Sequence, residues 1–164
     1  MANEQRRYSD LGRIDRNILR KLQRNGRLTY AELARSVGLT STPCMERVKR
    51  LEREGFIKAY AAILEPEKVD ASFVVFVMVR VARTSPSVFD EFEAAIKALP
   101  EVQECYLVSG NFDFLLKARV ADMSAYREFY GEKLLAFPGI QESISYTAME
   151  QVKETLEIPL GGRH

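Results

Sequence analysis

The residues with the clearest chemical signature lie in "VGLTSTPCMERVKRLEREGF", residues 37–56. Thr42 and Pro43 predict the start of a helix, as its N-cap and first helical residue, and Gly55 predicts its end. At about 100° per residue, an apolar stripe of this helix lies opposite a charged side. Such a charged side is more often only solvated, although lysine and arginine can also neutralise phosphates. The stripe comprises Cys44, Val48 and Leu51, and the charged side comprises Glu46, Lys49, Arg50 and Arg53, flanked by Arg47.

Groups that could perform catalysis are scarce. The single histidine, His164, is the last residue, so a Cys–His pair, a histidine base or a histidine metal site would depend on a chain end. Glu65 and Glu67, and likewise Glu91 and Glu93, are close in sequence, but a linker and an amphipathic helix usually present such residues to solvent. No glycine-rich phosphate loop is present in the sequence. We therefore expect no enzyme activity, no cofactor and no metal.

Two shorter helices are predicted before the charged one. In "LGRIDRNILRKLQRNG", Asp15 lies in the first turn and Asn25-Gly26 ends the helix. In "TYAELARSVG", Thr29 and Glu32 have capping-box spacing, and Gly38 ends the segment. Only a few residues join this helix to the next, so the two must cross steeply, as in a helix-turn-helix. The apolar residues of the first helix are Ile14, Ile18, Leu19 and Leu22.

The charge is divided unevenly along the chain. Residues 1–60 carry 14 Lys and Arg against 7 Asp and Glu, whereas residues 61–164 carry 10 against 16. A basic segment with a helix-turn-helix pattern is typical of nucleic-acid binding, so we expect the third helix to enter the major groove of double-stranded DNA. The predicted contacts are Ser41, Thr42, Met45, Glu46 and Lys49 near base edges, Arg50 or Arg53 near phosphate, and the flanking Arg47.

The length allows two small domains, separated by the polar stretch "EPEKVD". We expect a winged helix-turn-helix DNA-binding domain in residues 1–64, a linker in residues 65–70 and a second domain in residues 71–164. After Gly55, "FIKAYAAILEP" is apolar and suits a strand or wing that packs on the three helices.

Three features favour the cytoplasm. The longest apolar run, Phe73–Val79, is too short to span a membrane, and the N-terminus lacks a signal-peptide core. Cys44 in the apolar stripe and Cys105 in a predicted strand are more typical of small core residues than of a disulfide or metal site. We expect a cytoplasmic, nucleoid-associated protein with no membrane partner.

The second domain alternates strands and helices in the order βαββαβ, the α+β arrangement called ferredoxin-like. Its strands are predicted in "ASFVVFVMVRVA", "VQECYLV", "FLLKARV" and "IQESISYTAM". The two middle strands flank "SGNFD", a hairpin turn centred on Gly110-Asn111. The first helix is predicted to be capped by Ser85, opened by Pro86 and stopped by Pro100, and the second to run from the cap Asp122 to about Ala136, before a turn at Pro138-Gly139.

The first strand of this domain is apolar on both faces. Phe73, Val75, Val77 and Val79 alternate with Val74, Phe76 and Met78. The two helices can cover only one face of the sheet. We therefore expect sheet-to-sheet dimerisation to cover the other.

Four segments, "IDRNIL", "VGLTSTPCMERVKRLEREGFI", "ECYLVSGNFDFLLK" and "DMSAYREF", resemble the Lrp/AsnC family, with a match from about Asp10 to Met149. The resemblance implies a prokaryotic transcription regulator that binds DNA as dimers assembled into a larger ring, expected to be an octamer, with leucine or a related free amino acid as effector. Two features depart from the family. Gly12 stands where Asp is frequent, and the tail "ETLEIPLGGRH" does not resemble it.

The resemblance also implies an effector site near the hairpin loop, at the interface between dimers. A zwitterionic amino acid needs an anion, hydrogen-bond donors and an apolar wall. Asp113 could supply the anion and turn N–H groups around Gly110 the donors. Without the resemblance, a plain turn in which Asp113 bonds nearby backbone is the more common interpretation. The matching residues are Leu107, Val108, Gly110, Asp113, Met123, Tyr146, Thr147 and Ala148.

A second kind of DNA-binding protein fits the same pattern: a nucleoid-organising protein that wraps DNA with little regulation by a ligand. A ligand-dependent change in assembly or in DNA affinity separates the two hypotheses.

Overall fold

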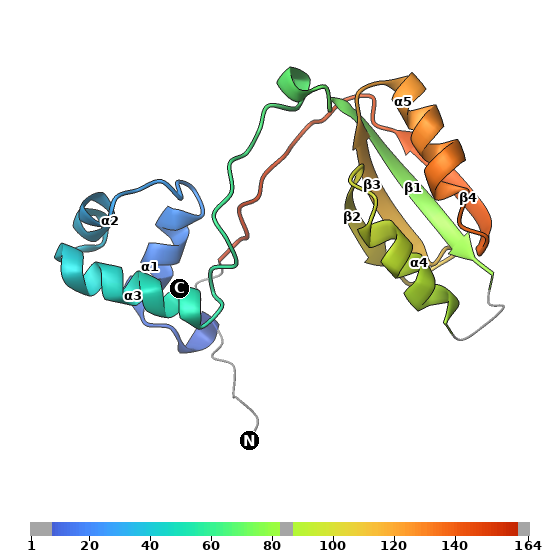
Figure 1. Ribbon diagram of the computed structural model, residues 1–164. Helices are drawn as coiled ribbons and strands as arrows, with labels where there is room; N and C mark the ends of the chain where they lie inside the picture. Colours follow the sequence, from blue (N-terminus) through green and yellow to red (C-terminus); the bar gives the residue numbers. More distant parts are fainter. Residues whose placement is uncertain (1–7, 83–86, 161–164) are drawn as a thin grey trace. The chain divides into compact units, whose positions relative to one another are not determined.

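The computed structural model describes residues 8–82 and 87–160 (Figure 1). They form two compact units, one of residues up to Ile63 together with those from Lys153 onward, the other of Leu64–Val152. After their predicted roles, we call these the DNA-binding unit and the effector unit. The division differs from the predicted domains, because residues 153–160 pack with the DNA-binding unit and the predicted linker, residues 65–70, groups with the effector unit. His164 lies outside the described residues.

Three helices build the DNA-binding unit, as predicted: α1 (Arg13–Leu22), α2 (Tyr30–Val37) and α3 (Ser41–Arg53), after a short 3-10 turn, η1 (Tyr8–Asp10). The predicted start of α3 is wrong by two residues. Thr40 has the extended backbone of an N-cap, and Ser41 and Thr42 are already helical. Pro43 still fits, because the N–H groups of a first turn have no acceptor within the helix.

The capping box of α2 is confirmed. The Thr29 side chain accepts a hydrogen bond from the Glu32 N–H at 3.2 Å, and the Glu32 carboxylate accepts one from the Thr29 N–H at 2.8 Å. Gly38 ends the helix in the left-handed conformation, with φ of 73°. Glycine adopts this backbone conformation without a steric cost, which explains why Gly38 in the sequence correctly predicts the end of the helix.

The core of this unit is formed by apolar side chains from all three helices. The apolar stripe predicted for α3 is confirmed, because Cys44, Val48 and Leu51 are all buried. Burial raises the pKa of the Cys44 thiol, as expected for a small core residue. The remaining buried apolar residues of this core are Leu11, Ile18, Leu19, Leu22, Leu33 and Ala34.

The segment after α3, predicted as a strand or wing that packs on the three helices, packs there but is not a strand. Residues 57–65 form neither helix nor strand, although Phe56 and Ile57 pack against the helical core. Tyr60, Ile63 and Leu64 are exposed. A single extended segment becomes a strand only where a second strand offers it hydrogen bonds, and apolar composition cannot supply that partner.

The effector unit has the predicted order of elements. After a 3-10 turn, η2 (Pro66–Val69), come β1 (Phe73–Val81), α4 (Val88–Lys97), β2 (Val102–Leu107) and β3 (Phe114–Val120). They are followed by α5 (Met123–Glu128), a π-helical continuation, η3 (Phe129–Leu134), and β4 (Ile140–Thr147). The strands form one antiparallel sheet in the order β2-β3-β1-β4, so the ferredoxin-like prediction is confirmed.

The helix boundaries of this unit agree only in part with the sequence signals. Ser85 and Pro86 lie outside the described residues, and Ser87 is the N-cap of α4. Asp122 caps α5 as predicted, accepting a hydrogen bond from the Ala125 N–H at 2.9 Å.

Both helices cover the same face of the sheet (Figure 1). On that face, Val75, Val77 and Val79 of β1 are fully buried beneath residues such as Phe92 and Phe129. Cys105 is exposed, so its predicted place in the core is wrong. Cys105 is exposed because its strand, β2, lies at the edge of the sheet.

The opposite face of the sheet, which we call the open face, carries large apolar side chains. Phe76 and Met78 of β1 pair with Tyr146 and Ile144 of β4, so all four share this face. Phe76 is 38% exposed and Ile144 43%. The alternation predicted for β1 is therefore confirmed.

Candidate DNA-binding helix and effector site

Helix α3 presents most of the predicted DNA contacts to solvent. Ser41, Thr42, Glu46, Lys49 and Arg53 are exposed, and Met45 is half-buried. The apolar stripe of the same helix is buried in the core, so the opposite side of the helix must face solvent. The basic charges of Lys49 and Arg53 are thus available to a phosphate backbone.

Arg47 and Arg50 differ from these residues because both bind a buried carboxylate on α1. Arg47 donates to one oxygen of Asp15 at 3.0 Å, and Arg50 donates to the other at 2.6 Å. Asp15 is only 4% exposed. The two arginines predicted as surface contacts therefore also hold α3 against α1.

Sequence reasoning gave Asp15 only a first-turn position and missed this role. A signal was present, since Asp15 has helical spacing with the buried residues Ile18, Leu19 and Leu22 and therefore lies on the apolar face of α1. An acid on such a face needs a partner, because an unpaired buried charge is very costly.

The hairpin loop between β2 and β3 is bonded to the end of β1. The Asp113 N–H donates to the Val79 carbonyl at 2.9 Å, and the Asp113 carboxylate accepts from the Val81 N–H at 3.0 Å. The Val108 N–H closes the loop by donating to the Asp113 carbonyl at 2.9 Å. Asp113 thus has a backbone partner, the feature expected of a turn residue, and it also borders a hollow.

That hollow has a volume of about 470 Å³. A volume of this size is ample for a free amino acid. Gly110 and Asp113 were predicted here, whereas Arg80, Asn111 and Gln141 were missed. The lining residues are Arg80, Val81, Gly110, Asn111, Asp113 and Gln141.

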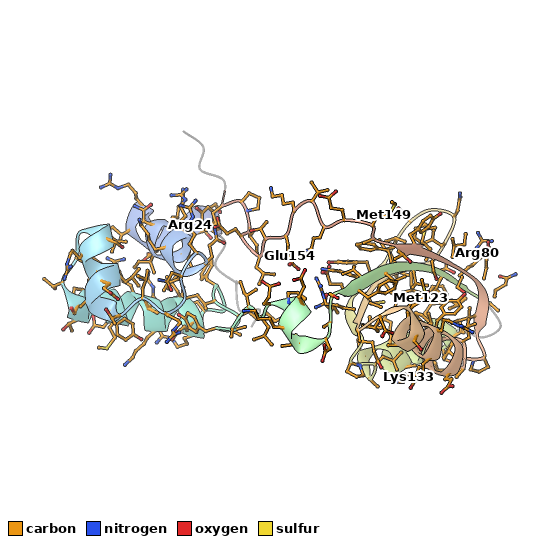
Figure 2. All side chains as sticks on the ribbon, turned by 90° about the horizontal axis from the view of Figure 1, so that it is seen from above. Arg24, Arg80, Met123, Lys133, Met149 and Glu154 are labelled. Carbon is orange, nitrogen blue, oxygen red and sulfur yellow. The ribbon has the colours of Figure 1, made fainter. Side chains whose placement is uncertain are left out.

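Arg80, labelled in Figure 2, is held by two partners. Its Nε donates to the Asn111 carbonyl at 2.9 Å, and its guanidinium forms an ion pair with Glu142 at 3.1 Å. A charge near the end of an otherwise apolar strand was the signal that could have identified it. Arg80 therefore supports the hairpin loop from the side of the hollow.

The predicted effector residues do not form one cluster within the chain. Leu107, Val108, Gly110 and Asp113 belong to the hairpin end of the sheet. Met123 starts α5 at the opposite end, where Thr147 pairs with Val75 and the Ala148 N–H donates to the Val74 carbonyl at 2.9 Å (Figure 1). Tyr146 precedes Thr147 and is exposed on the open face. Val81 lies six positions after Val75 on the same strand, so the two groups lie about 20 Å apart.

Neither a metal cluster nor a membrane-spanning helix is found in the described ranges, 8–82 and 87–160. There, no three His, Cys, Asp or Glu side chains are grouped so as to hold a metal ion. None of the helices in these ranges has both the length and the apolar character needed to cross a membrane.

Comparison with known proteins identifies both units. Residues 11–58 match the model of a winged helix-turn-helix DNA-binding domain, and residues 74–158 match that of the Lrp/AsnC ligand binding domain. The chain is 54% identical over 153 residues to the leucine-responsive regulatory protein of Salmonella typhimurium and 53% identical to that of Escherichia coli, covering 93% of each chain.

Solved structures agree with this assignment. A transcriptional regulator of Neisseria meningitidis in complex with L-Met has a TM-score of 0.88 and 37% identity, covering 92% of this chain and 97% of that one. An AsnC family transcriptional regulator from Agrobacterium tumefaciens has a TM-score of 0.88 and 41% identity over the same shares. These relatives are regulators rather than enzymes. This chain belongs to the Lrp/AsnC family of DNA-binding transcription regulators.

Proposed function

We propose that this regulator responds to leucine or a related free amino acid, which it binds at the effector unit and reports to DNA through α3. The relatives named for a leucine response and the neighbour solved with L-Met support this class of effector. The protein would act in the cytoplasm, at the nucleoid.

The observation that carries the proposal is the division of the predicted effector residues into two groups. Each group is accessible on one chain, yet the apolar surface of Met123 and Tyr146 lies apart from the polar groups of Asp113 and Gly110 that a zwitterion needs. The hairpin group supplies the Asp113 carboxylate for the ammonium, and Gly110 is a turn residue whose N–H could meet the carboxylate. Met123 and Tyr146 in the other group offer apolar surface. A second copy that brings its α5 end to this hairpin would complete the site.

The effector unit also offers the surfaces for assembly. The open face, with Phe76, Met78, Ile144 and Tyr146, is suited to face a second sheet and so form a dimer. The two effector groups then remain at the ends of each sheet. Contacts between dimers at these ends would build the larger ring, which we propose to be an octamer.

A panel of amino acids tests the proposal directly. Native mass spectrometry gives the size of the assembly, and a mobility shift gives its DNA affinity, each with and without leucine, methionine, alanine and lysine. We expect at least one of them to change the assembly, the affinity or both, because binding and assembly share the site. If none of them binds, the nucleoid-organising alternative takes the place of this proposal.

A further inference from the structure

The buried carboxylate of Asp15 links the first and third helices of the DNA-binding unit. Among the residues that the structure describes, it is the one charged residue in a core, and each of its oxygens receives a different arginine of α3. Arg47 and Arg50 lie three positions apart, on adjacent turns of one helix face. The carboxylate therefore resists both rotation and sliding of α3 along α1.

The arginines keep exposed N–H groups for a second partner, although the Nε of Arg50 is buried and lies 3.9 Å from the Glu54 carboxylate. Arg47 is 36% exposed and Arg50 31%, and a guanidinium has five N–H donors in a fixed plane. A buried carboxylate is tolerated only when it is paired, so Asp15 holds both guanidiniums in place. The remaining N–H groups can then donate to phosphate without further ordering of the side chains.

We propose that Asp15 is a positioning residue for DNA recognition, acting through Arg47 and Arg50. It sets the rotation of α3 in the major groove and orients the two guanidiniums. The inference rests on DNA binding through α3. It makes Asp15 a determinant of sequence discrimination although the residue itself cannot reach DNA.

Asp15→Asn tests this, because it keeps the shape and removes the charge. Two probes are needed: a duplex selected by the wild-type protein from a random-sequence pool, and a duplex of random sequence. We expect the affinity for the selected duplex to fall about tenfold or more and that for random DNA to change much less, since net positive charge rises. The matched control is Asp10→Asn, at an exposed acid in η1.

Thermal melting accompanies the titrations, so that only folded protein is compared. If Asp15→Asn does not fold, Arg47→Lys provides the same test at constant charge, and discrimination should again fall. A purely structural role would lower both affinities by one common factor. A selected-to-random ratio equal to that of the wild type in the folded variants overturns the proposal, whereas failure of the wild type to bind either duplex contradicts DNA binding itself.

A second, independent observation concerns the C-terminal segment, residues 153–160, which contacts the C-terminal end of α1 and the two residues that follow it. The Gln23 side-chain amide donates to the Ile158 carbonyl at 3.1 Å and accepts from the Ile158 N–H at 3.2 Å. Arg24 forms an ion pair with Glu157 at 3.3 Å, and Arg20 donates to the Leu160 carbonyl at 3.4 Å. Figure 2 labels Arg24 on this surface.

The family match and the structural division assign this segment to different units. The ligand-binding family model extends to residue 158, yet residues from Lys153 onward pack with the DNA-binding unit. Leu160 also contacts the helical core of that unit. The chain therefore joins the two units twice, once before β1 and once after β4. Only a few residues separate the bound segment from Thr147 and Ala148, which are predicted to contact the effector.

We infer that residues 153–160 form a strap that transmits the effector-bound state of β4 to α1. The inference rests on the proposed effector site. The strap is held by the paired Gln23 amide, one exposed ion pair, one hydrogen bond from Arg20 and the packing of Leu160. Because these contacts are few and lie at the surface, the strap can be released without unfolding either core. Its release should uncouple the two units while leaving each one able to bind its own ligand.

Gln23→Ala and a chain ending at Val152 test the strap. We expect amino-acid affinity, measured by calorimetry, to stay within about twofold of the wild type, while the effect of the amino acid on DNA affinity shrinks at least about threefold. Lys21→Ala, at an exposed position of the same helix, is the matched control. An unchanged effect of the amino acid in both variants overturns the strap. A wild type that never responds to an amino acid contradicts the proposed function instead.

Discussion

The two units differ in how they cover their apolar surfaces. The DNA-binding unit closes on itself: three helices share one core, a buried ion triad joins α1 to α3, and the C-terminal segment covers part of α1. The effector unit leaves an open apolar face and divides its predicted ligand residues between two ends. The first therefore has a closed core of its own, whereas we propose that the second is completed by further copies of the chain.

The largest expected effect is on assembly. Ile144→Lys places a charge on the open face, and a buried unpaired charge should raise the dimer dissociation constant about a hundredfold or more. Sedimentation velocity would show smaller species, with weaker DNA binding as a consequence. Ala94→Lys adds the same charge to the exposed side of α4 and should leave assembly unchanged. If the Ile144→Lys variant keeps its wild-type size, the open face is not the dimer interface.

The next effect concerns Asp113. Asp113→Asn keeps an acceptor for the Val81 N–H but removes the charge offered to the ammonium, so amino-acid binding should weaken about tenfold or more. DNA binding without effector should survive. Calorimetry measures the first and a mobility shift the second, with Asp90→Asn at an exposed acid of α4 as control. Wild-type effector affinity in Asp113→Asn would leave Asp113 as a turn residue only.

Within α3, the structure separates arginines that the sequence treats alike. Arg53 is exposed, so Arg53→Ala should weaken binding to every DNA sequence and reduce the salt slope by about one, with no change in melting temperature. Arg50→Ala should lower the melting temperature as well, because it leaves the Asp15 carboxylate with one partner fewer. Salt titrations and thermal melts of both variants decide this. Equal melting temperatures for the two would mean that the ion triad contributes nothing to stability.

Local chemistry explains which parts of the fold could be predicted from the sequence. The capping box of Thr29 and Glu32, the stop at Gly38 and the alternation in β1 each depend on residues close along the chain. The failures involve distant partners. The segment after Gly55 lacks a second strand, and its composition could not reveal that.

The candidate sites follow the same rule. Exposed α3 residues such as Lys49 were placed correctly, because helical spacing alone decides their direction. The pairing of Asp15 with Arg47 and Arg50 crosses more than thirty positions and has no local signature beyond an acid on an apolar face. Arg80 was missed for the same reason, since its partner Asn111 lies on a loop that only the folded sheet brings to the end of β1.

The smallest expected effect concerns how much the stability of the DNA-binding unit depends on the charge of Glu32. Hydrogen bonds from the Thr29 side chain and backbone lower the pKa of Glu32 below its usual value of 4.5. A carboxyl whose pKa is lower in the folded state stabilises the fold above the unfolded pKa and loses that contribution as the pH falls through the folded one. Glu32→Gln keeps a capping acceptor but cannot titrate. The melting temperature of the wild type should therefore fall relative to that of Glu32→Gln between about pH 5 and pH 3, and by only a small amount because the residue is exposed. A constant difference between the two chains across that range would mean that the Glu32 carboxylate contributes no pH-dependent stability, and that the box holds α2 through hydrogen-bond geometry alone.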